Sequence, residues 1–164
     1  MSASLVVVLA STAALANAAV GGITYAFSTF VMHGLDRTDP VEAITAKRAI
    51  NAEANSNVAF LLVVSAAAIL ALVLGIVGAT QLRQPGSWWL LVGGAFGVIA
   101  AIITMVFNVP LNNRLGGVDP GQLSSDDATR EWGAYFSSWM TWNHARTVAA
   151  FLSAALILAG LRYS

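Results

Sequence analysis

Residues 58–80 read VAFLLVVSAAAILALVLGIVGAT, a stretch without a charged side chain. About 20 apolar residues are enough for a helix to cross the hydrocarbon core of a bilayer. A helix of a soluble protein would show a polar face at a period of 3.6 residues, and no such face is visible here. Together with the apolar stretches on either side of it, the sequence predicts four spanning helices, at about residues 5–32, 56–80, 88–108 and 140–161.

Composition supports a membrane protein. Of the 164 residues, 57% are hydrophobic and only 10% are charged, with a mean hydropathy of +0.73, whereas soluble domains average about 25% charged residues. The absence of cysteine excludes disulfides, thiolate metal ligands and a cysteine nucleophile. The net charge is zero and no basic patch is visible, so we expect no nucleic-acid partner. The predicted fold class is all-α, with residues 1–164 forming a single integral-membrane, up-down four-helix bundle.

The links between the spans predict the topology. An even number of helices in an up-down bundle brings both ends of the chain to one side, together with the turn at Pro85-Gly86. The longer connections, 33–57 and 109–139, lie on the opposite side and contain all eight acidic residues. Within them we predict loops at 36–40 and 116–127. Most lysines and arginines also fall there, which by the positive-inside rule favours the cytoplasm for this side, but these connections are long and rich in acids, so both orientations stay open.

The N-terminal apolar stretch could also be a signal peptide, because Ala16-Asn17-Ala18 fits an A-x-A cleavage pattern. However, no basic region precedes it, and its apolar character continues to Val31. We therefore interpret it as a retained first span of a protein in the bacterial plasma membrane.

Two polar strings stand at the ends of apolar stretches: NVPLNN at 108–113 and WMTWNHAR at 139–146. Burying amides and a guanidinium is costly unless they find partners. The up-down topology brings these groups to one mouth of the bundle. One interpretation is a pocket; the other is a structural clamp of interhelical hydrogen bonds, each worth about 0.6–2 kcal/mol. From the residues alone, both interpretations stay open for Asn108, Asn143 and Arg146.

Other features have plainer interpretations. His33 and His144, with Glu53 or Asp36, could be metal ligands, but they lack the spacing of a metal motif, so we expect no bound metal. Glu53 sits where a helix begins, and its charge favours a capping role. The pair Gly93-x-x-x-Gly97 is typical of close helix packing and could also mediate self-association into a homo-oligomer.

Four segments together resemble the anthrone oxygenase-like family of small four-helix membrane proteins. Their order and spacing match over nearly the whole chain, with the NVPLNN and WNHARTVAA strings as the specific part. One position departs from the family pattern, in which a proline is expected where this chain has His33. The segments are 25–32 (YAFSTFVM), 49–51 (AIN), 107–113 (FNVPLNN) and 139–149 (WMTWNHARTVA).

The resemblance implies a cofactor-free oxygenase acting on an apolar phenolic or anthrone-like molecule. Such an enzyme lowers the pKa of its substrate with preorganised donors and lets the resulting enolate react with oxygen. The expected oxyanion donors are Arg146, Asn143 and Asn108. The base is left open between His144, His33 and Glu53. The expected substrate-binding residues are Asn51, Asn112, Trp139 and Trp142.

Two interpretations compete with the oxygenase. In the first, the chain is a non-enzymatic accessory subunit of a membrane protein partner, or a scaffold that binds a lipid or quinone, with the amides as a clamp. In the second it is a transporter, although the spans hold no acidic residue for ion coupling.

Overall fold

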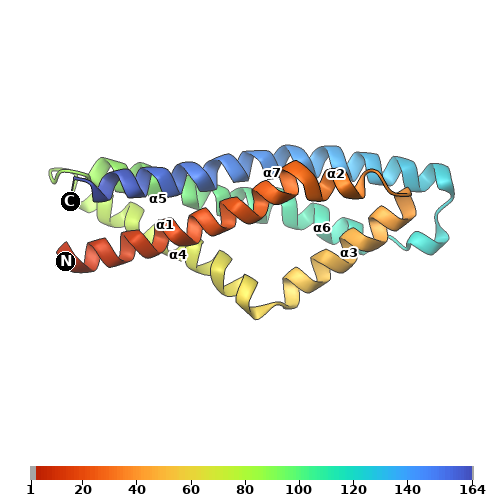
Figure 1. Ribbon diagram of the computed structural model, residues 1–164, viewed down its shortest axis with the longest axis horizontal. Helices are drawn as coiled ribbons and strands as arrows, with labels where there is room; N and C mark the ends of the chain where they lie inside the picture. Colours follow the sequence, from red (N-terminus) through yellow and green to blue (C-terminus); the bar gives the residue numbers. More distant parts are fainter. Residues whose placement is uncertain (1–2, 164) are drawn as a thin grey trace.

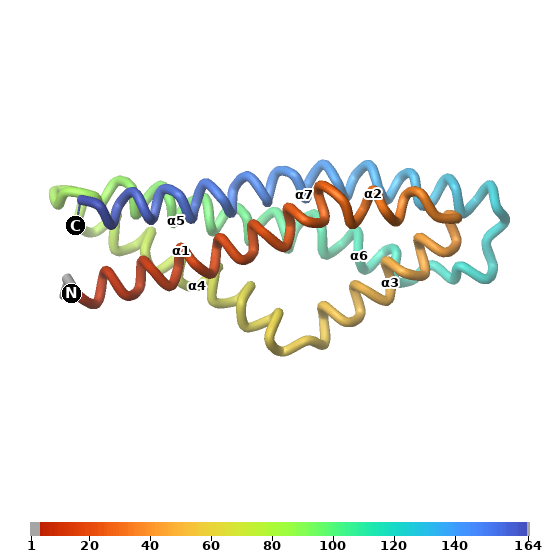
Figure 2. Tube along the Cα trace, in the orientation of Figure 1, coloured from red at the N-terminus to blue at the C-terminus, as the bar shows by residue number. Residues whose placement is uncertain are grey.

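The computed structural model describes residues 3–163, and helices form nearly all of that part of the chain, without a β-strand. Four rods of helix run along the long axis, and both ends of the chain lie at the same end of the molecule (Figures 1 and 2). The all-α bundle predicted from the apolar stretches is thereby confirmed. The helices are α1 (Ala3–Ala26), α2 (Met32–Leu35), α3 (Pro40–Ser56), α4 (Val58–Thr80), α5 (Ser87–Ile103), α6 (Val109–Gly116) and α7 (Ser125–Leu161).

Four helical segments are long and apolar enough to cross a membrane. They comprise Ser4–Leu35, Val58–Thr80, Ser87–Gly116 and Ser125–Leu161, which indicates an integral membrane protein. The first and third rods contain short π-helical turns, η1 (Phe27–Val31) and η2 (Thr104–Asn108). In η2 the amide of Val109 donates to the carbonyl of Thr104, so the rod continues past Pro110, which has no amide hydrogen.

The end of the bundle that holds the termini is packed through small residues. A Cβ on Gly94 would lie 2.5 Å from the carbonyl oxygen of Ala71, and one on Gly78 would lie 2.5 Å from the amide of Leu91. Both distances are shorter than any real contact, so α4 and α5 can only approach this closely because glycine lacks a side chain. Gly93 and Gly97, predicted as a packing pair, also face neighbours within the chain, Ile157 and Ala71.

The second rod is broken where α3 meets α4. Asn57 has an extended backbone (φ −79°, ψ 105°), and its side chain accepts a hydrogen bond from the amide of Phe60, which caps α4. The two helices therefore form an open V (Figure 1). As a result α3 leaves the line of α4 and packs against α7 and α6, with Ala43, Ile44 and Lys47 buried.

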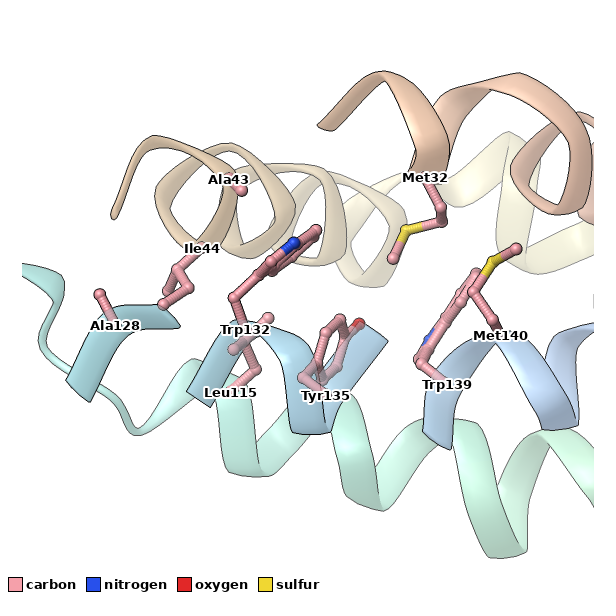
Figure 3. Packing of buried hydrophobic residues seen from close by; sticks show 9 residues of the cluster. All are labelled: Met32, Ala43, Ile44, Leu115, Ala128, Trp132, Tyr135, Trp139 and Met140. Atoms are coloured by element: carbon pink, nitrogen blue, oxygen red, sulfur yellow. The ribbon is translucent and has the colours of Figure 1, made fainter. Parts of the chain in front are cut away.

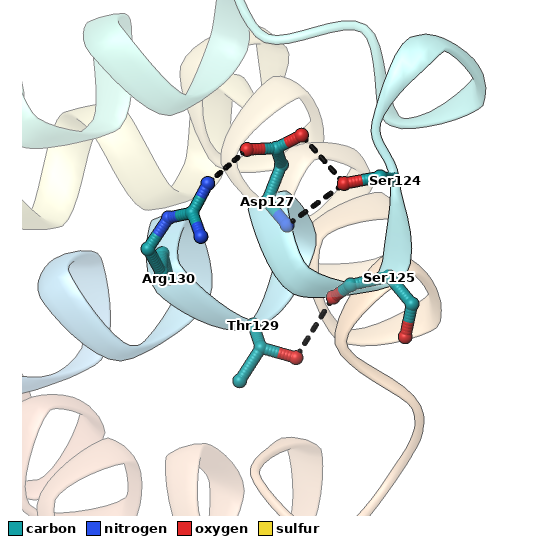
Figure 4. A network of polar contacts seen from close by, with 5 residues as sticks. All are labelled: Ser124, Ser125, Asp127, Thr129 and Arg130. Atoms are coloured by element: carbon teal, nitrogen blue, oxygen red, sulfur yellow. Dashed lines mark hydrogen bonds and ion pairs between the residues drawn. The ribbon is translucent and has the colours of Figure 1, made fainter.

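The connection predicted as a loop at 116–127 is shorter than expected. It contains a 3-10 turn, η3 (Pro120–Gln122), and α7 already begins at Ser125. The Ser124 hydroxyl caps α7 by accepting from the amide of Asp127 at 3.2 Å and donating to its carboxylate at 2.5 Å, while Arg130 pairs with the same carboxylate (Figure 4). The fourth rod thus starts well before residue 140, which carries it beyond the apolar stretch.

Candidate functional site

An aromatic core fills the bundle where α3, α6 and α7 meet. Trp132, Tyr135 and Trp139 are all buried, and their rings project from α7 toward Ile44 on α3 and Met32 on α2 (Figure 3). The spacing of three and four residues places these rings on one face of the helix. Amides and cations lie among them, so the polar groups predicted at this mouth of the bundle occupy an apolar surrounding.

Arg146 and Asn143 form the deeper half of the polar cluster. Arg146 donates from Nε and Nη2 to the amide oxygen of Asn143, at 2.8 and 2.6 Å. Asn143 is fully buried, and its Nδ2 donates to the carbonyl of Thr24 at 2.8 Å and to the hydroxyl of Ser28 at 2.7 Å. The arginine is therefore fixed to the first rod through a neutral side chain, and its positive charge is not cancelled there.

The two predicted amides of the third rod also join this cluster. The side-chain oxygen of Asn112 accepts hydrogen bonds from Tyr135 at 2.8 Å and from the indole of Trp139 at 2.9 Å. Asn108 is fully buried, and its Nδ2 donates to the carbonyl of Trp139 at 3.3 Å. Its Oδ1 has no hydrogen-bond partner within residues 3–163. One buried acceptor is therefore free beside the aromatic core.

Lys47 is the most unusual residue of the site. Its side chain is 1% exposed, and its ammonium lies 4.6 Å from the ring centroid of Trp139, 5.5 Å from that of Phe27 and 5.8 Å from that of Tyr135. Its hydrogen-bond partner is the amide oxygen of Asn51, one turn later in α3. Cation–π contacts of this kind offset part of the cost of burying the charge.

The two side chains that bring charge to the Trp139 ring, Lys47 and Arg146, are both basic. The guanidinium of Arg146 lies 5.2 Å from the same Trp139 ring that Lys47 faces. Within residues 3–163, the ion pairs are Arg114–Glu131 and Arg130–Asp127, and neither involves Lys47 or Arg146. Burial, and to a smaller extent the nearby charge of Arg146, lower the pKa of Lys47 to about 7. The carboxylate of Asp36 contacts this aromatic core, where it accepts from the indole of Trp132 at 2.8 Å, but it forms no ion pair with either basic group.

A groove of about 520 Å³ opens beside this cluster, between α3 and α6. Asn51 and Asn112 line it and also bond to the buried core, so they form its inner wall. The Nδ2 of Asn51 is buried beside the hydroxyl of Tyr135, but it makes no hydrogen bond of good geometry among the described residues. On the rim, Arg48 donates to the carbonyl of Gly116 at 3.1 Å and ties α3 to α6.

Of the residues predicted from sequence, Asn51, Asn108, Asn112, Trp139, Asn143 and Arg146 are brought together. Trp142 lies outside this group, stacked on Phe107 with 3.5 Å between ring centroids. His144 is exposed on the outer face of α7, and exposed His33 packs edge-on against Phe136 at 5.6 Å. Glu53 is exposed and accepts from Asn57. No group of three His, Asp or Glu side chains that could hold a metal occurs among residues 3–163.

The sequence interpretation missed Lys47, which it counted only as a loop charge. A signal was nevertheless present. Ala43, Ile44 and Lys47 follow the spacing of one helix face, so the lysine occupies a position where an apolar residue belongs. Asn51 follows it at the four-residue spacing at which side chains meet.

Comparison with known proteins gives one family. No curated protein and no solved structure shows a significant match to the chain. Residues 47–156 match the anthrone oxygenase family. This range begins at the buried lysine of α3, includes all of α4, α5 and α6, and covers α7 as far as residue 156, beyond Arg146. The match covers well over half of the sequence, and the chain therefore belongs to the anthrone oxygenase family.

Proposed function

We propose that the protein is a cofactor-free oxygenase of the bacterial plasma membrane, which converts a methylene group of a flat, apolar phenolic or anthrone-like molecule into a ketone. The observation that carries this proposal is a pair of basic residues, the fully buried Lys47 and the partly buried Arg146, which face one tryptophan and have no carboxylate partner in residues 3–163. A buried cation without a counter-ion is costly. A site built in this way suits a ligand that becomes an anion when it reacts.

The reaction needs only substrate and oxygen. Loss of a proton from the methylene gives an enolate, whose electrons pass to O₂ as the new C–O bond forms. Protonation yields a hydroperoxide, which loses water to leave the ketone, so R₂CH₂ and O₂ become R₂C=O and H₂O. The protein lowers the barrier by stabilising the oxyanion of the enolate in a low-dielectric site. No redox cofactor is required, because the carbanion itself reduces oxygen.

The cluster suggests distinct roles for its members. Arg146 is the oxyanion donor of the proposal, with a guanidinium held over the Trp139 ring. Asn143 uses its oxygen on Arg146 and its nitrogen on the first rod, so it is a positioning residue. Asn108 offers a free acceptor, which suits a substrate hydroxyl. Asn51 and Asn112 face the groove, where they would contact the edge of the substrate.

A non-enzymatic scaffold is the second candidate, and one observation favours it. All the hydrogen-bonding groups of the Asn143 side chain are satisfied within the protein, by Arg146, Thr24 and Ser28. Such a network could serve only to join α1 to α7.

Oxygen uptake with anthrone, measured together with thermal unfolding in detergent, separates the two candidates. Arg146→Lys keeps the charge but loses the planar fork of donors, so turnover should fall by about 10²–10³. Arg37→Lys, at an exposed position of the α2–α3 loop, is the matched control and should leave both measurements unchanged. The oxygenase would be refuted if the wild-type protein took up no oxygen with anthrone or related phenols and Arg146→Lys only lowered the melting temperature. The non-enzymatic scaffold would then be the remaining candidate.

A further inference from the structure

Lys47 can be protonated or neutral in this surrounding, and the two states differ in their interaction with Arg146. Arginine keeps its proton at any ordinary pH, so Arg146 is a permanent positive charge beside the Trp139 ring. If Lys47 is also protonated, two cations share the site, and among residues 3–163 only one hydrogen-bond acceptor, the amide oxygen of Asn51, serves the three donors of the ammonium. If Lys47 is neutral, the repulsion disappears and the amine has a free lone pair.

We propose that Lys47 is the base that takes the proton from the substrate, and that its ammonium and Arg146 are then the counter-ions of the substrate anion. This assignment rests on the proposed function for the nature of the substrate, an acidic hydroxy-aromatic or anthrone-like molecule. In the step, the nitrogen lone pair of Lys47 forms an N–H bond. The substrate O–H or C–H bond breaks, and its electron pair stays on the substrate.

The surroundings of Lys47 favour it over the other candidate bases. The titratable or charged groups that face it are Tyr135 and Arg146, both on α7, and neither is an acid that would hold the lysine in its charged form. Burial brings the pKa of Lys47 to about 7, so a large share of the molecules carry the neutral amine near neutral pH. His144, His33 and Glu53 are exposed; His33 packs on Phe136 at the edge of the aromatic core and Glu53 accepts from Asn57, and neither contact involves Lys47.

The groove between α3 and α6 gives the route to Lys47. Asn51 lines the groove, and its oxygen is the partner of the lysine, while its Nδ2 lies beside the Tyr135 hydroxyl without a hydrogen bond of good geometry in the described residues. A substrate oxygen that accepts from this Nδ2 lies beside the lysine, and rotation of the Asn51 side chain exchanges the amide oxygen for the substrate. Asn112 lines the groove from α6 and is held by Tyr135 and Trp139, so it positions the entering ring.

Binding of 2-naphthol under argon tests the proposal without any turnover. The phenolate of this flat, apolar phenol absorbs at longer wavelength than the neutral form. At about pH 8 free naphthol is neutral, as expected for a phenol, and Lys47 is mostly neutral as well. We expect the phenolate band to appear on binding to wild-type protein, with no proton released to a weakly buffered solution, because the proton stays on Lys47.

Three results would overturn the assignment. They are a wild type without a phenolate band up to saturating naphthol, a band accompanied by release of about one proton per naphthol, and a band retained in Lys47→Met. We expect Lys47→Met to lose the band and Arg37→Met, the exposed control, to keep it. The proton count needs only the wild-type protein, so it decides the matter even if Lys47→Met does not fold.

Oxygen uptake distinguishes this inference from the proposed function. If the wild type forms bound phenolate but consumes no oxygen with anthrone, the oxygenase proposal fails and the role of Lys47 as proton acceptor stands. If the wild type consumes oxygen and Lys47→Met does so equally fast, the oxygenase stands and the role of Lys47 is refuted. With both correct, Lys47→Met should lose about 10²–10⁴ in rate.

Discussion

Arg146 donates two hydrogen bonds to one neutral oxygen, that of Asn143, and a carboxylate would be the usual partner for such a fork. The amide orients the guanidinium without neutralising it. Asn143 is itself held by Thr24 and Ser28 of the first rod, so the position of the charge depends on the contact between α1 and α7. A site that binds an anion formed only during the reaction needs a guanidinium that is fixed in position and not already neutralised by a carboxylate.

Replacing Asn143 should therefore cost stability. Asn143→Ala removes the acceptor of Arg146 and the donor to Thr24 and Ser28, all in a fully buried position. Leaving such groups unpaired costs about 1–3 kcal/mol, more for a charged one. We expect a lower midpoint of thermal unfolding in detergent, with Ser138→Ala, at an exposed position of α7, as the neutral control. Equal midpoints for the two variants would show that the network adds no stability.

Much of the fold could be predicted because a bilayer restricts a chain to few solutions. Long apolar stretches without charges have to be helices, and short links between them impose an up-down order. The ends of the rods were less predictable. The third rod continues past Pro110 because the π turn before it changes the hydrogen-bond pattern, and the fourth begins at the Ser124 cap, in a polar segment that hydropathy reads as a loop.

The site was predictable only as far as polar residues stand at the ends of apolar stretches. Asn108, Asn143 and Arg146 do so, and the structure brings them together around Trp139. Lys47 stands inside a polar connection, and its burial depends on the break at Asn57, which directs α3 against α7. That direction is a property of the tertiary structure, so charge counting assigned the lysine to the solvent.

Two glycines in the helices of the bundle are expected to respond differently to substitution by alanine. A Cβ on Gly97 would lie 2.5 Å from the Cβ of Ala71 and 2.8 Å from the hydroxyl of Ser153, whereas one on Gly22 would meet no atom within 4 Å. Gly97→Ala should therefore lower the thermal midpoint, since neither neighbour can easily move. Gly22→Ala should be neutral or stabilise by up to about 1 kcal/mol, because alanine favours helix. The prediction fails if the two variants melt alike.

The position of the chain ends predicts the topology in the membrane. Both ends lie at the same end of the bundle, next to the α4–α5 turn (Figure 1). Reporter domains fused to either end should therefore be found on the same side of the membrane, and one inserted in the exposed segment at Gly121 should be found on the other. End fusions on opposite sides would contradict four spans.

The final prediction concerns how stability varies with pH. The pKa of Lys47 is about 7 in the folded protein and returns to its ordinary value of 10.5 when the chain unfolds. Between these two values the unfolded chain binds a proton that the folded protein does not, so stability rises with pH, by at most about 1.4 kcal/mol per pH unit. Below pH 7 both forms are protonated, and the full cost of burying the ammonium is present.

Lys47→Met removes this dependence and isolates it from the titration of other groups, which both proteins share. At about pH 6 the variant should be more stable than the wild type, because an apolar side chain of similar length replaces a buried cation among Phe27, Tyr135 and Trp139. The difference in thermal midpoint should shrink steadily up to about pH 10. A difference that does not change with pH would mean that Lys47 keeps its proton in the folded protein. A variant that is less stable at every pH would mean that Lys47 stabilises the fold. A lysine kept for its chemistry should instead lower the stability of the protein without substrate.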